Sequence, residues 1–173
     1  SRHSLEEGGD VFEPPRLCRQ TPLGTPRRRL GDPLRQQSPM QRFHERIRAK
    51  AANPWEPPVL IVAFGDSVTQ GMTTLDEQLH DDVYHARFRR LLEAQYPLCT
   101  FSVINAGVSG QTACGALSLL ERDVIRHQPD LTLVAFGLND AWNGENGVGD
   151  YVAALTAIVE RIDCETTSEV VLL

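Results

Sequence analysis

Three short loops in this sequence carry residues that could perform nucleophilic chemistry. The first is Gly65-Asp66-Ser67, which comes directly after the apolar run 59–64. The second, Asn105-Ala106-Gly107, and the third, Gly137-Leu138-Asn139-Asp140, each follow a further apolar run. Because open α/β sheets place their reactive groups at the carboxyl ends of strands, we expect these three loops to converge.

The chemistry that the loops predict is attack by a serine hydroxyl on an ester carbonyl. Ser67 is the candidate nucleophile. The backbone N–H groups of Ser67 and Gly107, together with the side-chain amide of Asn139, could stabilise the oxyanion that forms. Each loop alone is more simply explained as a tight turn or a helix cap. Three of them at successive strand ends favour the catalytic interpretation.

The elements that must position these loops alternate between strands and helices. Apolar runs predict strands over 59–64, 101–105, 131–136 and 169–173, and helical spacing predicts helices over 82–95, 112–127 and 149–163. Such alternation is typical of an α/β fold in which helices cover both faces of a parallel sheet.

In the order and spacing of its three blocks, the chain resembles the SGNH or GDSL serine hydrolases, a family of esterases, lipases and other acylhydrolases. The resemblance rests on Gly65 to Gly71, on Gly107 and on Asn139, and it covers residues 58–173. It implies a flavodoxin-like three-layer α/β/α sandwich with a parallel sheet, of which four strands are visible and the fifth is missing. It also implies hydrolysis of carboxylic esters (small acyl esters, lipids or acetylated carbohydrate) through an acyl-enzyme on Ser67, without a metal or other cofactor.

By the same resemblance, Ser67, Gly107 and Asn139 are the catalytic residues, but one block of the family pattern is missing. The family takes its catalytic acid and base from a late Asp-x-x-His block, and no such block follows the strand 169–173. A serine hydroxyl needs a neighbouring base to accept its proton. We therefore expect the natural chain to continue past Leu173, and the chain as given to be inactive.

The histidines within the chain are weaker candidates for that base. Asp82-Val83-Tyr84-His85 spells Asp-x-x-His, but its place in a helix predicts that His85 lies on the flank of the sheet. His127 precedes the strand 131–136, so we expect it at the opposite end of the sheet from Ser67. His80 is expected on a solvent-exposed loop or at the rim of the substrate site.

Two other functions fit parts of the pattern. A non-catalytic module could hold an ester or a glycan in the same pocket without cleaving it. Alternatively, Asp66 and Asp140 could chelate Mg²⁺ in a phosphoryl-handling domain, because Mg²⁺ is typically held by one or two carboxylates plus phosphate oxygens. Ser67, Gly107 and Asn139 would then be coincidental.

The charge distribution limits the possible partners. Residues 1–57 carry eleven Arg and Lys against seven Asp and Glu, whereas residues 58–173 carry six against sixteen. Because contacts to phosphates require clustered Lys and Arg, the acidic body argues against nucleic-acid binding. The cysteines are widely spaced without a CxxC pattern, which predicts neither a disulfide framework nor a zinc site: Cys18, Cys99, Cys114 and Cys164.

The composition predicts three parts. Residues 1–39 hold six of the eleven prolines and show no hydrophobic period, so they are predicted to form a disordered leader. Residues 40–57 are predicted to form a short amphipathic helix over 40–52 and a linker, and residues 58–173 the hydrolase domain. No apolar run has the length of a membrane span. The lack of a signal peptide favours a cytoplasmic protein, although a leader removed before Ser1 would leave secretion open. The sequence does not predict the oligomeric state.

Overall fold

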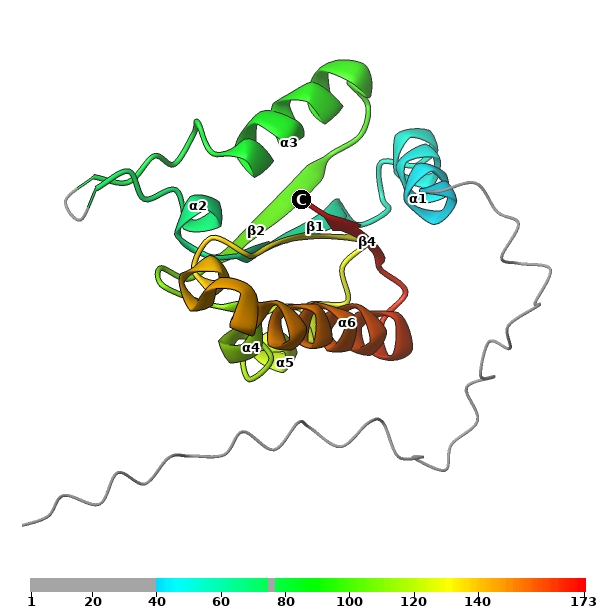
Figure 1. The fold of residues 1–173 in the computed structure, drawn as a ribbon. Helices are drawn as coiled ribbons and strands as arrows, with labels where there is room; N and C mark the ends of the chain where they lie inside the picture. The colour runs from blue at the N-terminus through cyan, green and yellow to red at the C-terminus, as the bar shows by residue number, and fades with distance from the viewer. Residues whose placement is uncertain (1–39, 75–76) are drawn as a thin grey trace, which may run out of the picture. The chain divides into compact units, whose positions relative to one another are not determined.

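The computed structural model describes residues 40–74 and 77–173, and the predicted leader over 1–39 lies outside these described residues. The described residues include a four-stranded sheet with strand order β2-β1-β3-β4 (Figure 1). All three strand pairs are parallel. The strands are β1 Val59–Gly65, β2 Phe101–Gly107, β3 Leu131–Ala135 and β4 Glu169–Leu172. The predicted α/β fold with a parallel sheet is confirmed.

Helices cover both faces of this sheet, as Figure 1 shows. The longer helices are α1 Gln41–Ala52, α3 Tyr84–Gln95 and α6 Val148–Glu165. The short helices are α2 Ser67–Gln70, α4 Ala113–Ala116, α5 Leu120–Asp123, η2 Ile125–His127 and η3 Asp140–Gly147. Helices α1 and α3 lie on one face, and α4, α5 and α6 lie on the other (Figure 1). Within the described residues, no helix combines the length and apolarity that crossing a membrane requires.

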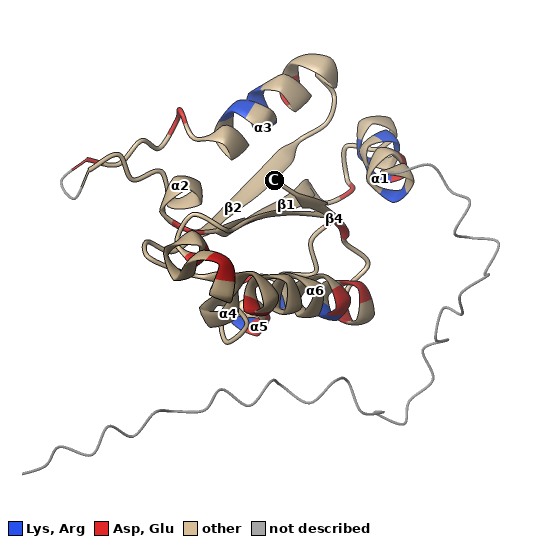
Figure 2. Ribbon diagram, in the orientation of Figure 1, with Lys and Arg blue, Asp and Glu red and all other residues tan. Residues whose placement is uncertain are grey.

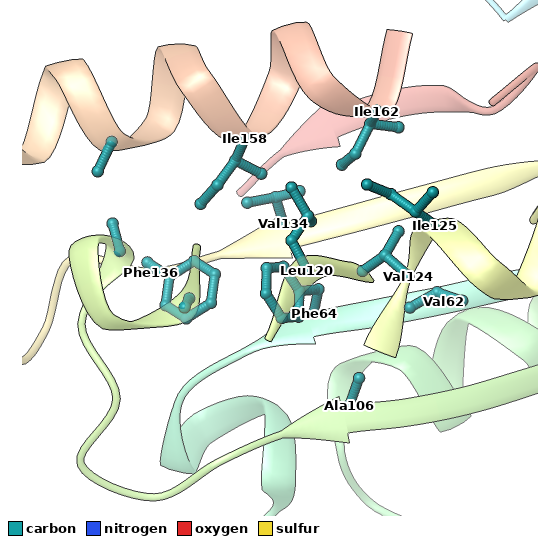
Figure 3. Close-up of a cluster of buried hydrophobic side chains, with 13 residues drawn as sticks. Val62, Phe64, Ala106, Leu120, Val124, Ile125, Val134, Phe136, Ile158 and Ile162 are labelled. Carbon is teal, nitrogen blue, oxygen red and sulfur yellow. The ribbon is translucent and has the colours of Figure 1, made fainter. Parts of the chain in front are cut away.

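The two faces of β1 feed two separate cores because side chains alternate along a strand. Val62 and Phe64 join the cluster beneath α4, α5 and α6, where Phe64 meets Phe136 edge to face with ring centroids 5.1 Å apart (Figure 3). Val59 and Ile61 join the cluster on the other face, which includes buried residues of α1. The apolar run 59–64 therefore forms a strand that is buried on both faces, as its sequence predicts.

The prediction of one continuous helix over 112–127 was wrong. The chain forms α4, α5 and η2 in succession, separated by tight turns in which the N–H of Leu119 donates to the carbonyl of Ala116, 2.9 Å away. The Ser118 hydroxyl donates to the carbonyl of Gly115 at 2.8 Å. Serine and glycine are both poor in helix interiors, the first because its hydroxyl competes for backbone groups and the second because of its backbone entropy. The apolar residues at helical spacing in this segment are nevertheless the ones that pack into the core.

Candidate active site

The turn that carries Ser67 begins where β1 ends. Asp66 caps α2, because its Oδ1 atom accepts a hydrogen bond from the backbone N–H of Val68 at 2.9 Å. The Asp66 side chain is buried, whereas Ser67 is half-buried. Among the described residues the Ser67 hydroxyl has no hydrogen-bond partner. The hydroxyl is thus presented at the carboxyl end of the central strand without being used to hold the fold.

The helix α2 has a single turn and is held in place by groups from outside it. Helices this short are not stable by themselves. The carbonyl of Thr69 accepts a hydrogen bond from Nε2 of His85, 3.0 Å away. The Thr69 hydroxyl lies 3.1 Å from the hydroxyl of Tyr84, and Thr69 is fully buried. The first turn of α3 therefore anchors the turn that presents Ser67.

The second block packs directly against the same turn. A Cβ atom on Gly107 would lie 2.6 Å from the Cα atom of Gln70, so only glycine fits here without displacing α2. The side chain of Asn105 donates from Nδ2 to the carbonyl of Gln70 at 3.2 Å. The Oε1 atom of Gln70 in turn accepts from the N–H of Ser109 at 2.7 Å. These contacts fasten the first block to the second.

The N–H of Gly107, which the sequence predicts to be an oxyanion donor, is already engaged. It donates to Oδ1 of Asn105 at 3.0 Å. Asn105 thus bonds to the first block with its amide nitrogen and to Gly107 with its amide oxygen. The sequence identifies this asparagine only as part of the block, because its role depends on a contact with α2, which lies far from it in the chain. For Gly107 to bind an oxyanion, its N–H must either donate to the oxyanion and to Asn105 at once or lose its hydrogen bond to Asn105.

The third block is tied to the segment that follows the second. Asn139 donates from Nδ2 to the carbonyl of Gln111 at 2.9 Å, which leaves its second amide hydrogen for another acceptor. Asp140 is buried, and its Oδ1 and Oδ2 atoms lie 3.0 and 3.2 Å from the N–H of Ala113, the donor to both. The structure thus connects the three predicted blocks, the first two directly and the third through Gln111 and Ala113.

The two carboxylates that the magnesium alternative requires are both occupied with backbone N–H groups. Asp66 accepts from Val68, and Asp140 accepts from Ala113. In the described part of the chain, no three His, Cys, Asp or Glu side chains gather as metal ligands would. The donor set therefore gives the phosphoryl-handling hypothesis no support.

His85 lies closer to the turn that carries Ser67 than the sequence predicted. Instead of a plain position on the flank of the sheet, it is buried and bonded to the residue two positions after Ser67. Burial lowers the pKa of His85, and the hydrogen bond to Thr69 opposes that shift. Burial also raises the pKa of Tyr84. The sequence signal for this contact was a histidine beside a tyrosine in the first turn of α3. The helical pattern alone does not predict which residue that histidine contacts.

The remaining histidines lie elsewhere. His80 is exposed, as predicted. His127 lines a pocket of about 200 Å³ together with Arg122, Asp123 and residues 104–108, which are the end of β2 and the residue after it. Gly107 is among the residues that line this pocket, whereas Ser67 and Asn139 are not.

Comparison with known proteins identifies related sequences. The GDSL-like lipase/acylhydrolase family matches residues 63–171, which include all three blocks. An acetylxylan esterase from Geobacillus stearothermophilus is 40% identical over 52 residues, which are 30% of this chain and 24% of that protein.

Solved structures resemble the chain over a longer stretch. The crystal structure of Axe2, an acetylxylan esterase from Geobacillus stearothermophilus, has a TM-score of 0.53 at 26% identity, and the match covers 65% of this chain and 57% of Axe2. A two-domain esterase active on acetylated mannans has a TM-score of 0.63 at 20% identity, covering 77% of this chain and 33% of that one, which shows a shared fold. The chain spans little more than half the length of the acetylxylan esterase. Since the family match covers most of the described residues, the chain belongs to the GDSL-like lipase/acylhydrolase family.

Proposed function

We propose that this protein hydrolyses carboxylic esters and that Ser67 is its nucleophile. The observation that carries the proposal is the position of Ser67, on a capped single turn at the carboxyl end of β1 with its hydroxyl unbonded among the described residues. The Ser67 oxygen attacks the ester carbonyl, the alcohol leaves, and water then releases the acid from the acyl-enzyme. The hydroxyl proton passes to a general base that we do not assign to any described residue.

The oxyanion of the tetrahedral intermediate would be held by three donors. These are the N–H of Ser67, the second amide hydrogen of Asn139, and the N–H of Gly107 in competition with Asn105. All three lie in blocks that the fold connects, which supports their joint action. In the family that the sequence resembles, the base comes from an Asp-x-x-His block.

Small acyl esters, and acetyl groups on carbohydrate in particular, are the substrates that we propose first. The support is that two of the relatives are acetylxylan esterases. Acetyl esters are small, and they require no deep acyl pocket beside Ser67.

Alanine variants test the assignment. In the full-length natural protein, assayed with p-nitrophenyl acetate and with acetylated xylooligosaccharides, Ser67→Ala should abolish turnover. Asn139→Ala should lower kcat by a factor of about 10² to 10³, the usual effect of losing one oxyanion donor. Asn143→Ala, an exposed asparagine of η3, is the matched control and should hydrolyse like the wild type. Undiminished hydrolysis by purified Ser67→Ala protein would contradict the proposal.

A second candidate is a binding module that holds an ester or glycan without cleaving it. The observation in its favour is that no histidine among the described residues bonds to the Ser67 hydroxyl. Calorimetry separates the two candidates: heat of binding with an acetylated oligosaccharide that is recovered intact supports the module, and released acetate supports the hydrolase. Loss of activity in EDTA would instead support a metal-dependent reaction.

A further inference from the structure

We propose that His85 is a positioning residue, which holds the turn bearing Ser67 in its reactive place by a hydrogen bond from Nε2 to the carbonyl of Thr69. The inference rests on the proposed role of Ser67 as nucleophile. It assigns to His85 neither proton transfer nor contact with substrate.

The helix α2 is too short to hold its own position. It comprises four residues, so its carbonyls lack the partners that a longer helix would supply. The carbonyl of Ser67 is bonded by the N–H groups of Gly71 and Met72, at 2.9 and 3.0 Å. The carbonyl of Thr69 is bonded by His85, whose side chain comes from a different helix.

The contacts of His85 fix both its tautomer and the orientation of its ring. A carbonyl can only accept, so in the neutral ring Nε2 carries the hydrogen and Nδ1 does not. The ring of Tyr84 packs edge-on against His85 with centroids 5.2 Å apart. Tyr84 also reaches the Thr69 hydroxyl, so both side chains hold the same residue.

A displacement of Thr69 would reach Ser67 through the turn that the two residues share. Thr69 is two residues from Ser67 within one turn, and its side chain fills the space next to Gly65, where an added Cβ would lie 2.9 Å from the Cβ of Thr69. A shift of Thr69 would therefore move the whole turn. Reactive groups must be held to about 0.5 Å for efficient catalysis.

The experiment compares His85→Met with His85→Gln. Methionine fills a similar volume but has no N–H, whereas glutamine can supply an amide N–H to Thr69. Hydrogen–deuterium exchange of residues 66–72 should be about tenfold faster in His85→Met and close to wild type in His85→Gln. In the full-length natural protein, the kcat for p-nitrophenyl acetate should fall about tenfold in His85→Met, with KM unchanged, and should recover in His85→Gln. His44→Ala, which changes an exposed histidine of α1, is the control and should alter neither.

Unchanged exchange over residues 66–72 in His85→Met would overturn the inference. Faster exchange spread equally over α3 and β2 would also overturn it, because that result would mean general loosening. Faster exchange with unchanged kcat would overturn the positioning role specifically. If Ser67→Ala proves as active as the wild type, the proposed function fails, and the exchange data still decide whether His85 holds the turn.

Discussion

At the scale of single residues, Gly107 has a packing role in the structure and a predicted role as an oxyanion donor. The sequence predicts it as a backbone donor, and the structure shows that its N–H is bonded to Asn105 while its Cα packs against Gln70. The packing alone explains why glycine is needed. The donor role remains a prediction, since it requires Asn105 to yield the N–H when a substrate oxyanion is present.

Gly107→Ala is therefore expected to damage both the turn and the activity. The added Cβ would overlap the backbone of Gln70, and backbone can give way only if α2 moves. We expect a drop in the free energy of unfolding of about 1–3 kcal/mol, as for other overpacked sites, and a large loss of kcat. Urea denaturation and ester hydrolysis measure the two effects.

Gly149→Ala is the matched control, because an added Cβ at this exposed position of α6 meets nothing within 4 Å. It should leave activity unchanged and stabilise the protein by up to about 1 kcal/mol, the helix propensity difference. Equal stability of Gly107→Ala and wild type would contradict the packing argument.

At the scale of elements, α1 is part of the core although the family match does not include it. The match begins at residue 63, whereas Phe43 and Ile47 of α1 are buried against β1 and its neighbours. Ion pairs add to this packing, with Arg46 Nε 3.4 Å from Asp130 and Arg42 Nε 3.8 Å from Glu169. Partly exposed pairs contribute little, so the apolar contacts dominate.

Ile47→Ala should lower the free energy of unfolding by about 2–5 kcal/mol, because the side chain is 1% exposed and its removal leaves a cavity. Arg48→Ala, on the exposed side of the same helix, should change stability by less than about 0.5 kcal/mol. Chemical denaturation of both variants measures the difference. A small effect of Ile47→Ala would mean that α1 is dispensable for the sheet.

The elements also show how far sequence patterns reach. The apolar runs predicted all four strands to within two residues. For β1 and β3 the signal is continuous because these strands are buried on both faces, whereas the edge strands β2 and β4 are mostly half-buried. The three loops were found because they follow these strands. The break of the helix at 117–119 and the anchoring of α2 by His85 were not predicted, since both depend on local bonds and tertiary contacts that periodicity does not encode.

At the scale of the whole molecule, charge is unevenly spread over the elements. Figure 2 shows Lys and Arg on α1 and α3, and acidic residues mainly toward the C-terminal end of α6. The sequence predicted an acidic body, and its expectation that the protein binds no nucleic acid stays a prediction. Stability should depend on pH mainly where a buried group must change its charge.

His85 is such a group, and the direction of its effect follows from its pKa. Burial lowers the pKa in the folded protein, whereas in the unfolded chain it stays near 6.5. Between these values the unfolded state binds more protons, so stability is fully present above about pH 6.5 and declines as the pH falls toward the folded pKa. Urea midpoints at about pH 7.5 and pH 5.5 should differ more in wild type than in His85→Gln. An equal difference in both proteins would exclude His85 as the cause.

The most direct test of the central claim is to trap the acyl-enzyme on Ser67. The protein is mixed with p-nitrophenyl acetate, quenched in acid, and analysed by intact-mass and peptide mass spectrometry. We predict one acetyl group, located on Ser67 and missing from Ser67→Ala. Hydrolysis that proceeds with an acetyl group on another residue, or without any acetyl group and equally in Ser67→Ala, would contradict the claim.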